Sequence, residues 1–303
     1  MDGPELSRRR LAVMLAMTGL EPALPAAALD LPDPSTLTEP TKTQRFQRRL
    51  TVQARINGQG PYAFLVDTGA NASVISSELA AQLNLQISGS ATLHGIAGVE
   101  TVETVKVDSI AVGRRVRRDL TLSVLPGRYV EGAGVLGLDW LGGQGLVLDF
   151  ARDQMRVGSI SPPIDDYTVS VPVKARPSGL HLIEARVASA SALAFIDTGS
   201  TTTVGNMALM RLAMHYRSVT SEWADIQLMS LTGQTVEGRL AALKTLGLGQ
   251  ITLRNVPVVF GPVHTFEYWG LVRRPAILIG IDILNAFQTV ALDFTRGQVH
   301  FRL

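Results

Sequence analysis

The tripeptide Asp-Thr-Gly occurs twice, at Asp67 and at Asp197, and each copy directly follows an apolar stretch. A single copy could be no more than a β-turn closed by an Asx hydrogen bond. Two carboxyl groups brought together can do more, because the ionised one can take a proton from water while the protonated one polarises a carbonyl group. The glycine gives each turn backbone freedom and lets amide N–H groups approach the carboxylate. Two aspartates placed in this way would have the chemistry needed to activate a water molecule.

The two turns belong to an internal repeat, because the residues around them occur twice in the same order. The first half reads AFLVDTGA, then VLGLD, then LDF, and the second half reads AFIDTGS, then LIGID, then LDF. These segments begin at residues 63, 135 and 148 in the first half and at residues 194, 278 and 292 in the second. The second half is longer between its first two segments, which indicates a loop insertion in a homologous unit.

Most of each half alternates between apolar and polar residues, as half-buried strands do. We expect strands over 50–56, 104–112 and 120–125, hairpin turns at 58–61 and 113–115, and helices over 77–83 and 207–214. The expected fold class is all-β, mainly antiparallel, with a few short helices. We expect an N-terminal lobe over 41–158, a proline-rich interlobe linker over 159–178 and a C-terminal lobe over 179–303.

With these motifs the sequence resembles the aspartic proteases, and within them the retropepsin-like enzymes of bacteria. The resemblance covers about residues 45–158 and 180–303 and is carried by the two turns and the glycines of the second motifs: Asp67, Thr68, Gly69, Ala70, Gly137, Asp197, Thr198, Gly199, Ser200 and Gly280. It implies a bilobal acid-protease fold whose two homologous lobes are related by a pseudo-twofold axis.

The same resemblance implies roles for these residues. Asp67 and Asp197 would be the catalytic carboxyls and would share one proton, since two like charges about 3 Å apart cannot both ionise cheaply. Thr68 and Thr198 would form reciprocal hydrogen bonds beneath them. Gly69, Gly199 and Ser200 would support the pair, and the segments of the structural glycines Gly137 and Gly280 would lie beside the turns.

Ala70 and Ser200 make the two turns unequal. A serine hydroxyl can donate to a carboxylate and favour its charged form, whereas alanine cannot. We therefore hypothesise that Asp197 is the better-ionised partner and that Asp67 more often holds the proton. The alternative is that Ser200 only caps the segment that follows it.

Two hairpins between the motifs are candidates for flaps that cover a substrate and exclude water. The tip of the first contains Gly95, Ile96, Ala97 and Gly98, and the tip of the second contains Leu231, Thr232 and Gly233. Either could instead be a plain surface hairpin. We expect His94, next to the first tip, to be exposed rather than catalytic.

Two further sets of polar residues have structural interpretations. Asp139 and Asp282 are expected to cap the short helices after the second motifs and to take no part in the reaction. Four arginines at 114, 115, 117 and 118 are expected to protect a solvated strand edge by charge, with recognition of an acidic partner or membrane surface as the alternative.

The amino terminus has the layout of a secretory signal peptide. Ser7–Arg10 is basic, Leu11–Leu20 is mostly apolar, and Ala26–Ala28 is a candidate cleavage site. We expect a signal peptide over 1–28, of the twin-arginine type, and a linker over 29–40, with the mature protein periplasmic or secreted. The apolar run is too short for a permanent membrane span. The alternative is a weakly helical N-terminus.

The composition excludes several classes of protein. The chain of 303 residues has no cysteine, so it has no disulfide and no thiol nucleophile, and its formal net charge is only +2. We expect no metal, no cofactor and no nucleic-acid partner. The sequence thus predicts an exported aspartic endopeptidase, a monomer with an internal pseudo-dimer that acts on polypeptides. A catalytically inactive peptide-binding module of the cell envelope, or a structural β protein, remains the alternative.

Overall fold

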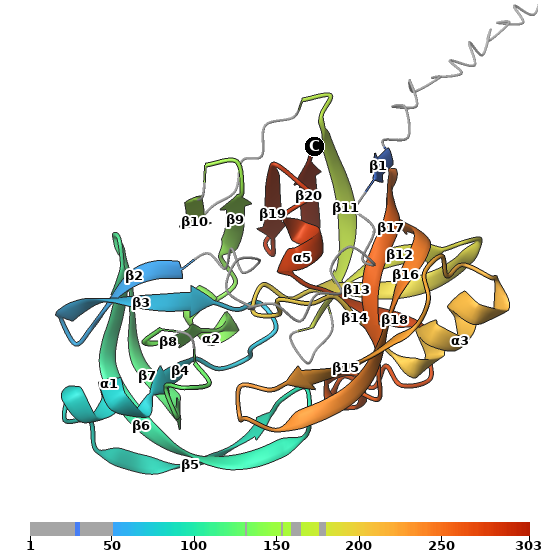
Figure 1. Cartoon of the computed structure of the whole chain (residues 1–303). Helices are drawn as coiled ribbons and strands as arrows, with labels where there is room; N and C mark the ends of the chain where they lie inside the picture. The colour runs from blue at the N-terminus through green and yellow to red at the C-terminus, as the bar shows by residue number, and fades with distance from the viewer. Residues whose placement is uncertain (1–27, 31–50, 131, 153, 159–164, 176–179) are drawn as a thin grey trace, which may run out of the picture.

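The computed structural model describes residues 28–30, 51–130, 132–152, 154–158, 165–175 and 180–303. These residues form two lobes built almost entirely of strands, with five short helices among the described residues (Figure 1). The all-β, two-lobed fold class predicted from the sequence is confirmed. Among these residues no helix has both the length and the apolar composition needed to cross a bilayer.

The N-terminal lobe is a sheet in the order β2-β3-β8-β4-β7-β6-β5. Its elements are β2 (Thr51–Ile56), β3 (Gln59–Val66), β4 (Val74–Ser76), α1 (Ser77–Gln82), β5 (Ile87–His94), β6 (Val99–Val112), β7 (Arg115–Leu125), β8 (Gly134–Leu136) and α2 (Leu138–Leu141). Two further strands of the first half, β9 (Gly145–Asp149) and β10 (Gln154–Gly158), belong to the other sheet.

The C-terminal lobe repeats this plan with a longer first helix and an additional short helix before its second motif. Its elements are β11 (Thr168–Ala175), β12 (His181–Val187), β13 (Ala190–Ile196), β14 (Val204–Gly205), α3 (Met207–His215), β15 (Ala224–Met229), β16 (Thr235–Leu248), β17 (Ile251–Phe260), α4 (His264–Tyr268), β18 (Ala276–Ile279), α5 (Ile281–Leu284), β19 (Thr289–Asp293) and β20 (Gln298–Arg302).

The strand pairings are the same in both halves. In the first, β3 runs parallel to β8, and β4 pairs antiparallel with β8 and parallel with β7. In the second, β13 runs parallel to β18, and β14 pairs antiparallel with β18 and parallel with β17. Each short strand leads into a helix whose N-cap side chain, Ser76 or Asn206, accepts a backbone N–H at the third residue beyond it. The two halves are therefore homologous in topology.

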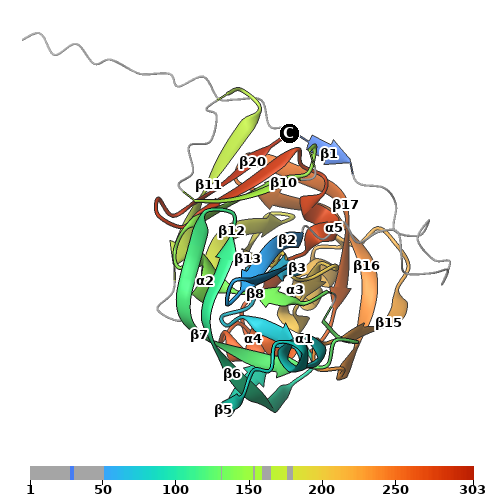
Figure 2. The same ribbon diagram turned by 90° about the vertical axis from the view of Figure 1, so that its left-hand side faces the viewer.

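The lobes are joined by strands from both halves, in the order β10-β9-β19-β20-β11. The pairing of β9 with β19 crosses the boundary and sets Leu148 opposite Val290. Both side chains are buried, and each stabilises the junction by roughly 1.5–3 kcal/mol. In Figure 2 the N-terminal lobe faces the viewer, and β10, β20 and β11 lie above it. This shared sheet fixes one lobe relative to the other.

The structure adds detail to two expected linkers and corrects one turn. The segment 159–178, predicted as the interlobe linker, contains most of β11, which pairs with β20 and β12. The first hairpin turn is Asn57–Gly58, both with positive φ, and not 58–61, because Gln59 already belongs to β3. The linker predicted over 29–40 begins within β1 (Ala28–Asp30), which pairs parallel with β17. The rest of the expected signal peptide and linker lies outside the described residues.

The basic patch has a structural use. Arg115 donates to the carbonyl oxygens of Trp140 and Leu141, at 3.0 and 2.6 Å, and Arg117 donates to that of Asp139 at 3.2 Å. These oxygens lie in and at the end of α2, where cations are favourable. At these two positions the arginines secure the helix that follows the Gly137 motif.

Candidate active site

Each Asp-Thr-Gly turn begins where a buried strand ends. The backbone N–H of Asp67 donates to Leu136 O at 2.9 Å, and that of Asp197 donates to Ile279 O at 3.0 Å. These bonds continue the parallel pairing of β3 with β8 and of β13 with β18. The carboxyl end of each strand therefore places its aspartate at the lobe boundary.

The turn conformation supplies amide donors to each carboxyl group. Gly69 N and Ala70 N donate to Asp67 Oδ1 at 2.7 and 3.2 Å. Gly199 N and Ser200 N donate to Asp197 Oδ1 at 2.9 and 3.1 Å. Two such hydrogen bonds favour an ionised carboxylate and fix its orientation.

The two carboxyl groups face each other across the lobe boundary. A Cβ atom added to Gly69 would lie 2.6 Å from Asp197 Cγ, and one added to Gly199 would overlap Asp67 Cγ. Each glycine thus packs directly against the carboxyl group of the opposite lobe. Asp67 is only 7% exposed, and Asp197 is partly exposed as a residue although its carboxyl group is buried.

The environment of Asp197 favours its protonated form. Burial is the main cause that raises its pKa well above the ordinary value, followed by the negative charge of Asp67 and a hydrogen bond with that side chain. The amides of Gly199 and Ser200 oppose the shift. The pair therefore retains a proton at a pH where an isolated aspartate would be ionised.

The hypothesis that Ser200 makes Asp197 the better-ionised partner is wrong. The Ser200 hydroxyl donates to Thr202 O at 2.8 Å and accepts from Thr202 N at 3.4 Å. The hydroxyl proton is thus used within the following turn, as the alternative interpretation held. Toward Asp197 the residue offers only its backbone N–H, just as Ala70 does toward Asp67.

Beneath the carboxyls, two threonines tie the lobes together. Thr68 N donates to Thr198 Oγ1 at 3.1 Å, and Thr198 N donates to Thr68 Oγ1 at 3.2 Å. Their hydroxyls donate in turn to Ile196 O and Val66 O, at 2.8 and 2.7 Å. Four bonds across the boundary hold the turns in register, and this is the reciprocal arrangement implied by the resemblance.

A second set of hydrogen bonds fixes the chain after each turn, and it was not predicted from the sequence. Asp139 accepts from the hydroxyl of Ser73 at 2.7 Å and from its N–H at 3.0 Å, while Gly137 N donates to Ser73 Oγ. Asp282, Thr203 and Gly280 repeat this pattern. The aspartates do not occupy the N-cap positions, which are the glycines themselves. They fasten the loops of the candidate site instead.

Burial raises the pKa of Asp282 from its ordinary value of 3.8 to about 6, against the lowering effect of its hydrogen bonds from Thr203 and Ile283. The folded protein then binds this proton more tightly than the unfolded chain does. The contribution of Asp282 to the free energy of unfolding is complete below about pH 4. It decreases by roughly 3 kcal/mol as the pH rises through 6. Urea unfolding from pH 4 to 7 should therefore show a flatter pH dependence for Asp282→Asn than for the parent protein.

The control for this experiment is Asp139→Asn, which removes the carboxylate at the equivalent position of the other lobe. Comparing the slope of each variant with that of the parent separates the contribution of Asp282 from that of the facing carboxyls, which titrate in all three proteins. Equal slopes for Asp282→Asn and the parent would show that the buried carboxyl does not drive the pH dependence.

The two predicted flap tips lie at the ends of long hairpins and touch each other. The first tip, 95–98, joins β5 to β6, and the second, 230–234, joins β15 to β16. Gly95 packs against the side chain of Ser230, and a Cβ atom on Gly98 would lie 2.9 Å from Gln234 Oε1. The absence of side chains at Gly95 and Gly98 lets the two tips approach closely.

Each tip also crosses to the opposite lobe. Ile96 packs against the apolar cluster of the C-terminal lobe, which includes Phe195 and Phe266. Leu231 packs against the cluster of the N-terminal lobe, which includes Leu65 and Leu125. Figure 1 shows the β5–β6 hairpin and β15 approaching each other at the lower edge of the molecule. The two hairpin tips are therefore in contact with each other and with the opposite lobe in this structure.

Two tyrosines that sequence analysis did not single out contact the flaps. Tyr129 packs against Gly233 of the second tip. Tyr268, on α4, stacks on His94 of the first hairpin with ring centroids 4.4 Å apart and accepts a hydrogen bond from Asn71 Nδ2 at 3.3 Å. Helix α4 lies between the first two repeated segments of the second half, where the sequence predicted an insertion. That extra length was the signal in the sequence for this helix.

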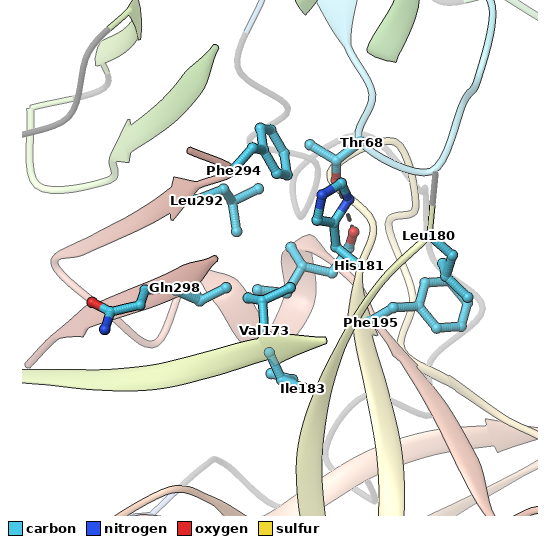
Figure 3. A pocket seen from close by; sticks show the side chains of 11 residues that line it. Thr68, Val173, Leu180, His181, Ile183, Phe195, Leu292, Phe294 and Gln298 are labelled. Carbon is cyan, nitrogen blue, oxygen red and sulfur yellow. Dashed lines mark hydrogen bonds between the residues drawn. The ribbon is translucent and has the colours of Figure 1, made fainter. Parts of the chain in front are cut away.

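A small pocket lies beside Thr68 (Figure 3). Besides the threonine it is lined by residues of β11, β12, β13, β19, β20 and the adjoining turns: Val173, Leu180, His181, Ile183, Phe195, Ile196, Leu292, Phe294, Gln298 and Val299. It has room for about one water molecule and is too small for a substrate side chain.

Two family models match the chain in tandem. The model described as "gag-polyprotein putative aspartyl protease" matches residues 52–143, and the model described as "Aspartyl protease" matches residues 183–283. Each match contains one Asp-Thr-Gly turn, one flap hairpin and one second-motif glycine. A comparison with curated proteins gave no match.

Proposed function

We propose that this chain, which belongs to the aspartyl proteases and carries two retropepsin-like lobes in tandem, is an exported endopeptidase that cleaves peptide bonds with a water molecule activated between Asp67 and Asp197. The observation that carries this proposal is the pair of facing carboxyls, each packed against the glycine of the opposite turn. A protease function in general follows from the two family matches.

The reaction uses the one proton that the pair retains. The ionised carboxyl takes a proton from the water as its oxygen attacks the peptide carbonyl carbon, and the protonated carboxyl donates a hydrogen bond to the carbonyl oxygen. The C–N bond then breaks, and a proton passes to the leaving nitrogen. The raised pKa of Asp197 supports its role as the proton donor.

The substrate would be a polypeptide in extended conformation. Such a chain can form backbone hydrogen bonds with β-strands while its alternate side chains enter pockets. The apolar clusters that receive Ile96 and Leu231 in this structure lie on both sides of the lobe boundary. The flaps would cover the bound chain and exclude bulk water from the carboxyls.

The experiment that tests this function measures turnover and its water source together. The purified protein would be incubated at pH 4–7 with an unfolded polypeptide in ¹⁸O-labelled water, and the products analysed by mass spectrometry. We expect internal cleavage, with one labelled oxygen in each new C-terminal carboxylate. Binding of the polypeptide without cleavage would support the inactive peptide-binding module instead.

Export is a separate part of the proposal and rests on the sequence of residues 1–28. The basic, apolar and small-residue regions occur there in the order that secretory signals require. Sequencing the N-terminus of the protein recovered from bacterial periplasm should show cleavage after Ala28. Recovery of the uncleaved chain from the cytosol alone would refute export.

A further inference from the structure

A pair of histidines joins the first flap to the C-terminal lobe. His94 Nδ1 and His264 Nε2 are 3.0 Å apart, and the two rings are nearly parallel, with centroids separated by 5.4 Å. His94 is the last residue of β5, and His264 is the first residue of α4. The ring of His94 also stacks on Tyr268. The first flap is thus joined to α4 by a hydrogen bond between two imidazole rings.

We propose that His94 and His264 form a latch that keeps the first flap closed and loosens it when both rings are protonated. The proposal rests on the proposed function, since the flap controls access to the carboxyls. Asp67 is 7% exposed in this structure, and the first flap tip lies across the lobe boundary, where Ile96 packs against the C-terminal lobe. His94 and His264 are positioning residues and do not touch the reacting atoms.

The number of protons on the His94 and His264 rings decides whether the hydrogen bond between them can form. The hydrogen bond needs one nitrogen that carries a proton and one that carries a lone pair, so it forms between two neutral rings or between one neutral and one charged ring. Glu267 Oε2 lies 3.3 Å from His264 Nδ1 and accepts a hydrogen bond from it. Protonation of both rings leaves two N–H groups facing each other and two like charges in contact. The hydrogen bond between the rings is therefore lost when both are protonated.

The other ionisable groups nearby do not replace this pair. On β6, Glu100 is opposite Leu93 and lies on the other face of the hairpin from His94. Glu103 shares the face of His94 but is four residues from Val99, roughly 13 Å along the strand. On α4 and after it, Glu267, Tyr268, Arg273 and Arg274 are ionisable, and Glu267 is the one bonded to His264. The second flap tip, 230–234, has no ionisable side chain.

The latch also connects the flap to the loop of one carboxyl. Asn71 follows the Asp67 turn and donates to Tyr268 Oη, and Tyr268 stacks on His94. His264 N donates to Ile96 O at 2.9 Å, so the tip keeps one backbone bond to α4 when the rings separate. Protonation would therefore loosen the flap without detaching it, and a substrate could still be covered after it enters.

The test measures flap position directly. Because the chain has no cysteine, Ser90→Cys on β5 and Lys244→Cys on β16 would place two spin labels at exposed sites of the flap and the C-terminal lobe. Distances measured by electron–electron double resonance from pH 4.5 to 7.5 should lengthen as the pH falls. In His94→Phe, which keeps an aromatic ring for Tyr268 and lacks the imidazole, the distance should not depend on pH.

His215→Gln, on α3, is the matched control and should keep the full pH dependence. In assays at pH 7.5, His94→Phe should raise kcat/KM by roughly fivefold over the parent, which corresponds to about 1 kcal/mol for the lost bond. Two results would overturn the latch. One is a spin-label distance in the parent that does not change with pH, and the other is a pH-dependent change of that distance in His94→Phe with the same midpoint pH as in the parent. The distance measurement needs no turnover, so a failure of the proposed function would be seen separately, as absent cleavage with an intact pH-dependent distance.

Discussion

Replacing Asp67 or Asp197 by asparagine should lower kcat for peptide cleavage by at least about 10³-fold. An amide is uncharged and cannot accept the proton of the water or return one to the leaving nitrogen. Each single variant also removes the like charge that keeps a proton on the pair, so either change alone disables both halves of the reaction. Binding of substrate should change little, because the amide has the size and shape of the carboxyl group.

The appropriate control is Asp108→Asn, which neutralises an exposed aspartate on β6. Both variants of the pair should fold, since the amide oxygen can still accept from the turn amides at Gly69 or Gly199. Circular dichroism and thermal unfolding would verify this. Cleavage at the parent rate in either folded variant would show that the facing carboxyls are not the source of hydrolysis.

Gly199→Ala is expected to have the second largest effect. The added methyl group would overlap the Asp67 carboxyl group, which is fixed by the amides of Gly69 and Ala70 and cannot move aside without losing them. The turn, or the whole lobe boundary, must shift. A misplacement of about 1 Å costs on the order of 10²-fold in rate, and overpacking of this kind costs roughly 1–3 kcal/mol of stability.

The matched control for this change is Gly247→Ala on β16. The nearest atoms to an added Cβ atom there are those of Arg186, at 3.4 Å, which is ordinary contact. That variant should keep the activity of the parent within about twofold. Full activity in Gly199→Ala, measured as kcat on the same unfolded polypeptide, would mean that the carboxyls are less closely packed than the structure has them.

Much of the fold follows from local sequence patterns. Alternating residues specify most of the strands, because the side chains of a strand alternate between faces. The repeated segments specify two equivalent lobes, because equivalent sequences fold to equivalent topology. The prolines of 159–178 predicted a linker but not the strand within it, because Pro172 is accommodated in β11, which pairs with β20 and β12.

The sequence by itself determined the two turns, the two lobes and the positions of the flaps. Only the tertiary structure decided which hydrogen-bond partner each polar group finds. Ser200 could donate to Asp197 or to Thr202 O, and the conformation of its turn brings Thr202 O within reach. His94 and His264 are 170 residues apart, and no spacing rule connects them. A hydrogen bond forms only with a partner within about 3 Å, and for residues far apart in the chain that distance is set by how their elements pack together.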